Sequence, residues 1–447
     1  MTPVSLHPQN PHYFLFRNKP TILIGSTEHY GAVLNADFDY ATYLDQLKAD
    51  GLNLTRTFTG VYNEAPGWFD ITGNTLAPAH EKLLCPFARS DIPGFAGGGN
   101  KFDLTRWDDG YFRRLKDFVA FAGRHGIVVE LTLFCPFYED SMWDISPFKA
   151  GNNVNGIGDV PRAEAYTLKR KDLLAVQEAT VRKIVQELKD ADNLYYEICN
   201  EPYVCDGSLL EWQHRIADVI AAAEKDFPAR HMIAQNIATG KAQIDKPHPT
   251  VSLFNFHYAT PPDTVGMNYS LERALGDDET GFKGQADATY RREGWEFILA
   301  GGALYDHLDY SFTVDHPKGT FKCPPKQPGG GSPALRAQLW ILKQFMESLD
   351  FVHMKPDHSP VKSVQPAVAA YRLLANPGHA YAMYLFGGTQ ADVTLELPSG
   401  QYRAEWVNTL TGRIDKAEQV THASGEVTLS SPGYDQDVAV KIIRMGR

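Results

Sequence analysis

The stretch Leu194-Tyr195-Tyr196-Glu197-Ile198-Cys199-Asn200-Glu201-Pro202 decides how this sequence is interpreted. Its apolar run, rich in residues that favour strands, ends abruptly in an amide, a carboxylate and a proline. If the strand is regular, Glu197 and Glu201 share one side and Asn200 lies on the other. At the carboxyl end of a barrel strand, Glu201 points into the barrel mouth, where burial can raise its pKa as a general acid requires. A glutamate that caps the next helix or pairs with an arginine is the alternative.

The pattern around this strand predicts repeated βα units. From Thr21 to Phe312, short apolar and β-branched runs alternate with longer amphipathic stretches. A weak run near Ala274–Glu279 brings the expected strands to eight, the number that a closed parallel barrel requires. The expected strands are Thr21–Ser26, Leu52–Thr57, Ile127–Phe134, Asn193–Cys199, His231–Ile237, Val251–His257, Ala274–Glu279 and Ala303–Phe312.

Helices and two long loops are expected between these strands. The expected helices are Tyr40–Asp50, Asp109–Arg124, Ala165–Asp190, Leu209–Asp226, Ala286–Ala300 and Pro333–Leu349. Several of them end at a glycine or before a proline, which are common helix stops. The segments Val61–Lys101 and Val314–Ser332 follow the second and eighth strands. In a barrel both loops therefore lie at the face where active sites are built.

The pattern changes after about Pro356. Short strand-like runs separated by Gly and Pro turns predict a small antiparallel β-sandwich. These runs are Ala380–Phe386, Ala391–Leu397, Tyr402–Asn408, Gly425–Leu429 and Val438–Ile443. We therefore expect an α/β chain, with a (β/α)₈ TIM barrel in residues 1–355 and a sandwich of structural role in residues 356–447. An N-terminal hairpin around Tyr13–Phe16 is expected at the barrel bottom or against the sandwich.

The segment Tyr196–Pro202 resembles the fourth-strand motif of clan A glycoside hydrolases, the group that includes cellulases, mannanases and β-galactosidases. The resemblance implies that Glu201 is the catalytic acid/base and that Asn200 hydrogen-bonds the substrate 2-hydroxyl. The clan places its nucleophile, another glutamate, at the end of the seventh strand. Glu279, in Glu279-Thr280-Gly281, is the best candidate, although its strand is interrupted by charged residues. Weaker candidates are Glu272, Glu293 and Glu296.

Further residues fit the same resemblance. Leu52–Arg56 resembles the clan's second-strand motif, in which the arginine, here Arg56, lies beneath the nucleophile and keeps it ionised. His257-Tyr258 resembles the clan's sixth-strand pair, in which the His contacts sugar and the Tyr hydrogen-bonds the nucleophile. Glu28, His29 and Tyr30 close the first strand, and we expect them to contact sugar at the mouth.

One feature of the clan is missing from the sequence. Many members end the eighth strand with a tryptophan that forms the floor of the sugar subsite, but Tyr305–Phe312 contains none. A Tyr, Phe or His of this strand is expected to take its place, or Trp68 or Trp143 from a loop.

The composition of the chain disfavours two classes of binding partner. With 43 Lys and Arg against 54 Asp and Glu, the net charge of −11 disfavours nucleic acid and anionic membranes. The five cysteines are scattered without a CxxC pair, so no zinc site or disulfide framework is expected, and Cys135 and Cys199 should be buried. No apolar segment approaches the ~20 residues of a membrane span. The N-terminus lacks the features of a signal peptide, which fits a cytosolic protein or a secreted one whose signal was removed.

These observations predict a retaining O-glycosidase that acts on an oligosaccharide or glycoside, with no metal or organic cofactor. The expected bond is a β-glycoside of a plant or microbial oligosaccharide, cleaved by double displacement. Two alternatives stay open. One is a non-catalytic barrel that binds glycans. The other is a metal-dependent hydrolase that uses His257 and the acidic cluster Asp277, Asp278 and Glu279.

Overall fold

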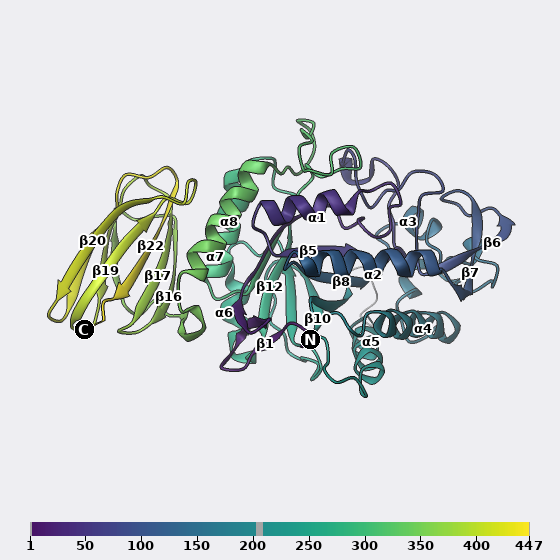
Figure 1. The fold of residues 1–447 in the computed structure, drawn as a ribbon, viewed down its shortest axis with the longest axis horizontal. Helices are drawn as coiled ribbons and strands as arrows, with labels where there is room; N and C mark the ends of the chain where they lie inside the picture. The colour runs from purple at the N-terminus through teal and green to yellow at the C-terminus, as the bar shows by residue number, and fades with distance from the viewer. Residues whose placement is uncertain (1, 203–208, 447) are drawn as a thin grey trace.

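The computed structural model describes residues 2–202 and 209–446. A parallel barrel occupies the middle of the elongated molecule, and antiparallel sheets lie at one end (Figure 1). The barrel sheet has the strand order β4-β13-β12-β11-β10-β9-β8-β5. Its strands are β4 (Leu23–Thr27), β5 (Leu54–Phe58), β8 (Val128–Phe134), β9 (Leu194–Cys199), β10 (Ile233–Thr239), β11 (Leu253–His257), β12 (Ala274–Thr280) and β13 (Leu304–Leu308). Each overlaps one predicted strand, so the predicted eight-stranded barrel is confirmed.

The barrel closes between β4 and β5 through the side chain of Asn53. Its Oδ1 accepts a hydrogen bond from the Ile24 N–H at 2.9 Å, and its Nδ2 donates to the Ile22 carbonyl at 2.9 Å. The Asn53 main-chain N–H donates to the Ile24 carbonyl. An asparagine amide carries the same donor and acceptor as a peptide group, so Asn53 satisfies strand groups that would otherwise be unpaired.

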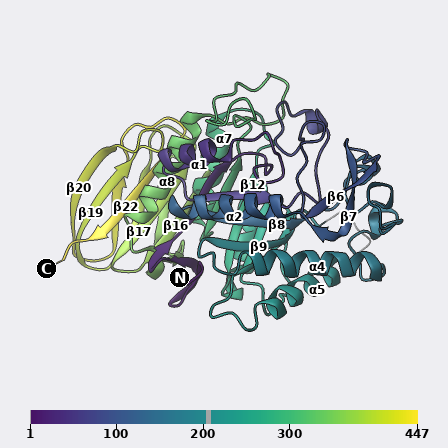
Figure 2. The ribbon, with the colours of Figure 1, turned by 45° about the vertical axis from the view of Figure 1, so that its right-hand side comes forward.

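Helices cover the outside of the barrel, and Figure 2 shows α4 and α5 lying side by side there. The longer helices are α1 (Tyr40–Ala49), α2 (Asp109–Arg124), α4 (Lys171–Glu187), α5 (Leu209–Ala223), α7 (Asp287–Leu299) and α8 (Pro333–Glu347). In α2, Asp108 caps the first turn by accepting from the Tyr111 N–H, and Leu115, Phe118 and Val119 are buried on one face. No helix in the part of the chain described here is long and apolar enough to cross a membrane.

The helix predicted for Ala165–Asp190 is shorter than expected, because α4 begins only at Lys171. Tyr166 is instead buried among aromatic rings, stacked on Phe137 and close to Trp212. This long-range packing holds the preceding segment in a loop that local helix propensity does not indicate. Short elements that the sequence pattern did not indicate are α3 (Asp140–Asp144), α6 (Asp263–Asn268), η1 (Trp68–Asp70), η2 (Ala150–Asn152), η3 (Arg162–Glu164), η4 (Tyr269–Leu271) and η5 (Phe351–His353).

The long segment after β5 contains a hairpin. Strands β6 (Phe87–Pro93) and β7 (Asn100–Trp107) pair antiparallel, at the end of the molecule opposite the antiparallel sheets (Figure 1). The guanidinium of Arg89 lies over the ring of Phe102 at 3.9 Å and donates to the Asn100 carbonyl. The side chain of Arg89 therefore stabilises the hairpin. The Gly- and Pro-rich sequence of this segment shows no alternating apolar pattern, so it did not indicate strands.

A three-stranded N-terminal sheet lies at the bottom of the barrel. It consists of β1 (Ser5–His7), β2 (Asn10–Phe16) and β3 (Lys19–Thr21). Arg17 forms an ion pair with Asp192, just before β9, and His12 Nδ1 lies 3.2 Å from the carbonyl of Arg273, just before β12. Both contacts are at the amino ends of barrel strands, so the segment closes the bottom and does not join the sandwich.

The C-terminal region is a sandwich of two antiparallel sheets, as predicted. One sheet has the order β14-β16-β17-β22-β19-β20 and the other β15-β18-β21. The strands are β14 (Lys355–Pro356), β15 (Val361–Gln365), β16 (Ala370–Asn376), β17 (Ala380–Phe386), β18 (Asp392–Glu396), β19 (Gly400–Val407), β20 (Ile414–His422), β21 (Glu426–Ser430) and β22 (Asp437–Arg444). Tyr381, Met383, Leu395 and Trp406 belong to the core between the sheets. The domain boundary at residue 356 stays a prediction.

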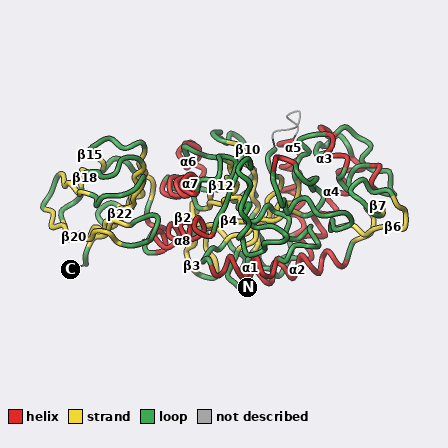
Figure 3. The backbone as a smooth tube through the Cα atoms, turned by 90° about the horizontal axis from the view of Figure 1, so that it is seen from above, coloured by secondary structure: helices red, strands yellow, loops and turns green. Residues whose placement is uncertain are grey.

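The larger sheet of the sandwich packs against α7 and α8 of the barrel, which lie between the two parts in Figure 3. Trp295 of α7 stacks on Tyr384 with ring centroids 5.5 Å apart. Arg291 forms a buried ion pair with Asp437, which also accepts a hydrogen bond from the Tyr384 hydroxyl. This interface is apolar and internally paired, which is consistent with a structural role for the sandwich.

Three of the described cysteines are buried. Cys135 and Cys199 are almost fully buried, as the sequence predicted, and Cys85 is buried as well. Cys323 is partly buried, and Cys205 lies outside the described residues.

Candidate functional site

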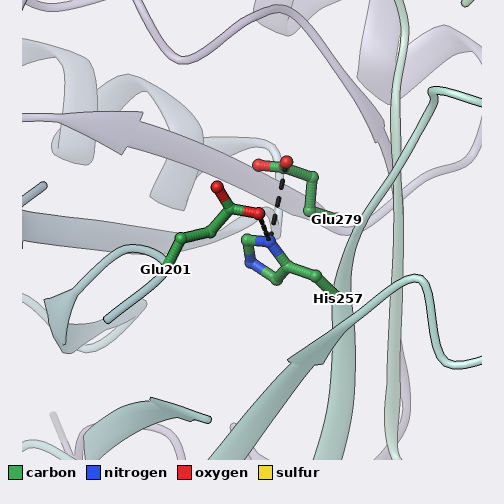
Figure 4. A group of neighbouring side chains, drawn as sticks. All are labelled: Glu201, His257 and Glu279. Carbon is green, nitrogen blue, oxygen red and sulfur yellow. Dashed lines mark hydrogen bonds and ion pairs between the residues drawn. The ribbon is translucent and has the colours of Figure 1, made fainter. Parts of the chain in front are cut away.

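Two carboxyl groups from distant parts of the chain meet at the carboxyl ends of the barrel strands. Glu201 follows β9 directly, Glu279 lies near the end of β12, and each residue is only 6% exposed. An oxygen of Glu201 and an oxygen of Glu279 lie within 4.8 Å of each other, and both face the ring of His257 (Figure 4). The backbone φ of Glu201 is +37°, a left-handed conformation that residues other than glycine rarely adopt. Such strained residues are concentrated at functional sites.

Three donors hold the carboxylate of Glu279. Arg56 Nη1 donates to Oε2 at 3.1 Å, and the Tyr30 hydroxyl donates to the same oxygen at 2.9 Å. The Tyr258 hydroxyl donates to Oε1 at 2.6 Å. Hydrogen bonds of this kind stabilise the anion of a buried carboxyl group. Glu279 is therefore held as an oriented, charge-balanced carboxylate.

The charged residues that weaken the sequence pattern of β12 are all buried in the structure. Asp278 points into the barrel and accepts a hydrogen bond from Asn255 Nδ2 at 3.0 Å. Asp277 accepts from the N–H of Ala259, just after the neighbouring strand β11, at 3.3 Å. The strand is therefore well formed, and its apolar pattern is poor because this barrel has a polar interior.

Glu201 contacts a tyrosine and a histidine. The Tyr138 hydroxyl donates to Oε2 at 2.6 Å, and Nδ1 of His257 lies 2.9 Å from Oε1. The same Nδ1 lies 3.6 Å from Glu279, and Nε2 lies 3.3 Å from Asp278. Burial alone would lower the pKa of His257, but Glu279 and Asp278 outweigh it and hold that pKa well above its ordinary value. His257 is therefore a buried cation that links the two carboxyl groups from below.

A layer of charged groups lies beneath this pair. Arg56 is fully buried and forms ion pairs with Glu197 at 2.5 Å, and with Glu130 and Asp278 at 3.3 Å. Asn255 Nδ2 donates to all three of these carboxyl groups. Burial raises the pKa of Glu130 well above its ordinary value, and that of Glu197 to about 7. The predicted place of Arg56 beneath Glu279 agrees with this geometry.

A cavity of about 290 Å³ opens above the carboxyl pair. Its rim carries Phe69 and Phe282, which are 41% and 37% exposed and whose ring centroids lie 6.5 Å apart. The lining residues are His29, Tyr30, Phe58, Tyr62, Glu64, Phe69, Leu76, Cys135, Tyr138, Asn200, Glu201, Tyr258, Glu279 and Phe282. A small cavity with aromatic walls and a few convergent polar groups is the usual form of a small-molecule site.

Four of the predicted binding residues line this cavity, namely Asn200, His29, Tyr30 and Tyr258. Asn200 accepts from Arg56 Nη2 through Oδ1 at 2.7 Å and donates from Nδ2 to the Tyr138 hydroxyl at 2.9 Å. His29 and Tyr30 lie on the wall of the cavity. Burial, and then the charge of Arg56, lower the pKa of His29 to about 3, so the ring is neutral. By contrast, Arg56 and His257 are fully buried below the cavity and are absent from its lining.

Glu28 was expected at the mouth, and this expectation is wrong. Its carboxylate is fully buried and accepts hydrogen bonds from the main-chain N–H groups of Gly31 and Ala32, both at 2.9 Å. It also accepts from the Thr75 hydroxyl. These three donors hold Glu28 as an anchor for the loop after β4, away from the cavity lining.

The acidic cluster Asp277, Asp278 and Glu279 does not form one metal site. The register of β12 shifts after Asp277, so Asp278 and Glu279 both turn inward and pair with Arg56, whereas Asp277 accepts a hydrogen bond from the Ala259 N–H. Among the described residues, Glu279 groups with Glu201 and His257 at the spacing of metal ligands, and Asp278 groups with Glu130 and Glu197. Asp277 belongs to neither group. A metal site built on all three neighbours is therefore excluded.

The weaker nucleophile candidates lie away from the cavity lining. Glu293 pairs with Lys283, and Glu296 pairs with Arg292 and Arg372. Glu272 follows the short helix η4 at the other end of β12. None of these carboxyl groups is placed to meet Glu201.

The aromatic rim comes from loops and not from the eighth strand. Phe69 follows Trp68, and Phe282 follows the Glu279-Thr280-Gly281 turn. Neither Trp68 nor Trp143 lines the cavity, and no residue of Tyr305–Phe312 does. Trp143 is buried and donates its Nε1–H to the Val160 carbonyl. The expected substitutes for the missing tryptophan are therefore wrong, because the loop after β5 turns Phe69 and not Trp68 toward the opening.

Sequence reasoning missed Glu64, Tyr138 and the aromatic rim. Glu64 and Tyr138 lie in loops after β5 and β8, where no hydrophobic period indicates direction. Their position after barrel strands, on the face that forms active sites, is the one signal that could have drawn attention to them.

Comparison with known proteins places this architecture. No family model matches the sequence, and no curated protein sequence matches it. A solved structure described as a glycoside hydrolase is 14% identical, with a TM-score of 0.66 over 99% of this chain and 97% of that one. A glycoside hydrolase family 5 structure from Bacteroides vulgatus is also 14% identical, with a TM-score of 0.65 over 99% and 93% of the two chains.

The chain has the fold of these glycoside hydrolases. The match spans nearly the whole length of both chains, and therefore includes the barrel and the sandwich. A family 5 mannosidase from Rhizomucor miehei is similar over 78% of this chain, with 11% identity and a TM-score of 0.53. At such low identities the similarity establishes the architecture, and the activity has to be argued from the site.

Proposed function

We propose that the protein is a retaining glycoside hydrolase in which Glu279 is the nucleophile and Glu201 the acid/base. The observation that carries this proposal is the approach of the two carboxyl groups, with oxygens within 4.8 Å at the mouth of the barrel. Retaining enzymes need carboxyl groups roughly 5–5.5 Å apart, whereas inverting enzymes leave room for a water at about 6.5–9.5 Å. The short separation supports double displacement.

The surroundings of each carboxyl group suit its proposed role. Arg56, Tyr30 and Tyr258 stabilise Glu279 as an anion that is ready to attack the anomeric carbon. Glu201 is reached from the other side by the Tyr138 hydroxyl at 2.6 Å, and His257 Nδ1 lies 2.9 Å from its second oxygen. These contacts orient Glu201 at the cavity wall, where it can give a proton to the leaving oxygen and later take one from water.

The reaction has two balanced steps. Glu279 forms a bond to the anomeric carbon while the glycosidic C–O bond breaks and Glu201 gives its proton to the leaving oxygen. Glu201, now a carboxylate, removes a proton from water, whose oxygen attacks the anomeric carbon and displaces Glu279. Both carboxyl groups return to their starting states. Asn200, at the cavity wall, is proposed to hydrogen-bond the 2-hydroxyl.

A set of aryl β-glycosides with proton NMR of the first-formed anomer tests this proposal. We expect retention of configuration for every substrate that is cleaved. The Glu279→Gln variant should lose activity by about 10⁴-fold or more, and a 2-fluoro-glycoside should label Glu279 in the wild type. First-formed product of inverted configuration, or a label on another residue, would reject the assignment.

The proposed role of Glu201 is tested with substrates that differ in their leaving group. In the Glu201→Ala variant, the loss of kcat should be large for a poorly leaving alkyl aglycone and small for a dinitrophenyl aglycone, which needs no protonation. Equal losses on both substrates would argue against an acid/base role. The Glu224→Gln variant alters a buried carboxyl group that is paired with His231 outside the cavity, and serves as a control.

A metal-dependent hydrolase is the second candidate. Glu201, His257 and Glu279 have the spacing of metal ligands, which is the specific observation that favours it. The two proposals predict different effects of a metal chelator on the activity. Full activity after dialysis against EDTA, with no metal found by elemental analysis, supports the glycosidase mechanism, whereas loss of activity and its restoration by one divalent metal supports the second candidate.

A further inference from the structure

A third carboxyl group lines the cavity, and the proposed mechanism does not use it. Glu64 comes from the loop after β5 and is 4% exposed, yet it shares the cavity wall with Glu201 and Glu279. Among the described residues, no Lys, Arg or His forms an ion pair with Glu64 at 4.0 Å or less. Burying a carboxyl group without a cation is costly, so its presence at this wall calls for a functional reason.

The loop is built to hold Glu64 in one orientation. The Tyr62 hydroxyl donates to Oε1 at 2.9 Å, and Asn74 Nδ2 donates to Oε2 at 2.5 Å. The Glu64 main-chain N–H donates to the Leu76 carbonyl, and Asn74 Oδ1 accepts from the Leu76 N–H. Each carboxylate oxygen can accept two hydrogen bonds, so each retains one acceptor position after these contacts.

The charge of the cavity lining restricts what can enter. Among the described residues, the lining contains three glutamates and no lysine or arginine. Its one histidine, His29, is neutral because burial lowers its pKa to about 3. In the resting enzyme Glu201 carries the proton of the proposed acid/base, and burial raises the pKa of Glu64 to about 7, so Glu64 is charged mainly above that pH. There a second anion would meet the carboxylates of Glu64 and Glu279 at low dielectric, with no lysine or arginine among the described lining residues to balance it.

We propose that Glu64 is a specificity-determining residue that accepts hydrogen bonds from two neighbouring hydroxyls of the sugar ring, so that the enzyme selects neutral glycosides and rejects uronides. This inference rests on the proposed glycosidase function. A diol and a carboxylate form a bidentate pair in which each hydroxyl donates to one oxygen, and such charge-assisted bonds are stronger than neutral ones. A uronide places its own carboxylate against those of Glu64 and Glu279.

The test compares wild type with Glu64→Gln and Glu64→Ala on neutral aryl β-glycosides, their monodeoxy analogues and the corresponding aryl β-uronides. For Glu64→Gln we expect kcat/KM on the best neutral substrate to fall about 100-fold, the order expected for loss of a charged hydrogen bond. The loss should shrink at least tenfold on the deoxy analogue that lacks the hydroxyl bound by Glu64. The ratio of uronide to neutral activity should rise at least tenfold.

A structural effect alone would not change these ratios, because misfolding lowers the activity on all substrates by the same factor. Glu81→Gln, an exposed carboxyl of the same loop, is the matched control and should behave as wild type. The proposal is overturned if Glu64→Gln equals wild type on neutral substrates, if its loss is equal on all analogues, or if the wild type prefers uronides or aminodeoxy glycosides.

Failure of this inference is distinguishable from failure of the glycosidase proposal. Labelling of Glu279 by a 2-fluoro-glycoside reports on the mechanism and should occur in Glu64→Gln, only more slowly. Titration calorimetry of the wild type and Glu64→Gln with neutral monosaccharides and uronic acids measures selectivity without turnover. Weaker binding of neutral sugars by Glu64→Gln supports the inference even if no glycoside is cleaved, and unchanged binding contradicts it.

Discussion

Arg56 and Arg336 are both fully buried, yet the charges around them differ. Arg336, on α8, forms ion pairs with Asp50 and Asp309, and its remaining hydrogen bonds go to Ser311 and to main-chain carbonyls. Arg56, on β5, is surrounded by four carboxyl groups within 3.3 Å, those of Glu130, Glu197, Asp278 and Glu279.

The difference separates a cluster that joins helices and loops from one that reaches the cavity. The Arg336 cluster joins α8 to the end of α1 and to the loop after β13, and none of its members lines the cavity. The Arg56 cluster contains four carboxyl groups, more than the single positive charge of one guanidinium can neutralise. Burial therefore favours the protonated form of some of them and raises the pKa of Glu197 to about 7. Its upper member, Glu279, is the one that reaches the cavity.

Of the replacements outside the proposed catalytic pair, that of Arg56 should have the largest effect on activity. Arg56→Met leaves the four carboxyl groups without their shared cation and removes a donor to Glu279. We expect kcat/KM on the best aryl glycoside to fall about 1,000-fold, since breaking a buried ion pair costs about 3–5 kcal/mol. Arg56→Lys, which keeps the charge, should recover part of the loss. An Arg56→Met variant with more than a tenth of wild-type kcat/KM would contradict the proposed role.

Replacing Arg336 should affect stability instead. Arg336→Met leaves the carboxylates of Asp50 and Asp309 without their cation. We therefore expect the free energy of unfolding in urea to fall by about 3–5 kcal/mol. At temperatures where the variant is folded, kcat should stay within about threefold of wild type, because the cluster does not reach the cavity. A large drop in kcat without a loss of stability would show that the two clusters are not separated as described.

Glu197 should make stability depend on pH. Its folded pKa, about 7, lies above the ordinary value of 4.5, so the folded state holds this proton more tightly than the unfolded state. The resulting stabilisation is present below about pH 4.5 and is lost as the pH rises to about 7. Urea unfolding between pH 4.5 and 7.5 should therefore show a shallower decline in Glu197→Gln than in wild type. Identical slopes would contradict a protonated Glu197 beside Arg56.

The smallest effect is expected at the cavity rim, opposite the Arg56 cluster. Phe69 is 41% exposed, so Phe69→Ala should change stability little. Its ring is expected to stack on the leaving group, and its loss should raise KM about three- to tenfold with kcat nearly unchanged, the range of about 0.5–1.5 kcal/mol for aromatic pairs. Phe121→Ala, at a partly buried ring outside the cavity, is the control. An unchanged KM would remove Phe69 from the binding surface.

The barrel was predictable because its signal is local and repeated. Alternating apolar runs and amphipathic stretches indicated all eight strands, including the weak one that carries Glu279. The fourth-strand motif placed Glu201 at a strand end, and parallel strands bring such ends together. Elements without a local period were missed, such as the β6–β7 hairpin around Arg89 and the late start of α4 at Lys171.

The sequence alone determined the barrel and the sandwich, because the apolar periods of strands and helices are local. The resemblance to the clan A motifs singled out Glu201 and Glu279 at strand ends. Only the tertiary structure decided what surrounds Glu201 and Glu279. Loops have no such period, so long-range packing brought Glu64 to the cavity wall, turned Phe69 to its rim and drew Glu28 away from it. The sequence therefore indicated the carboxyl pair, whereas the packing of the loops decided which other residues line the cavity.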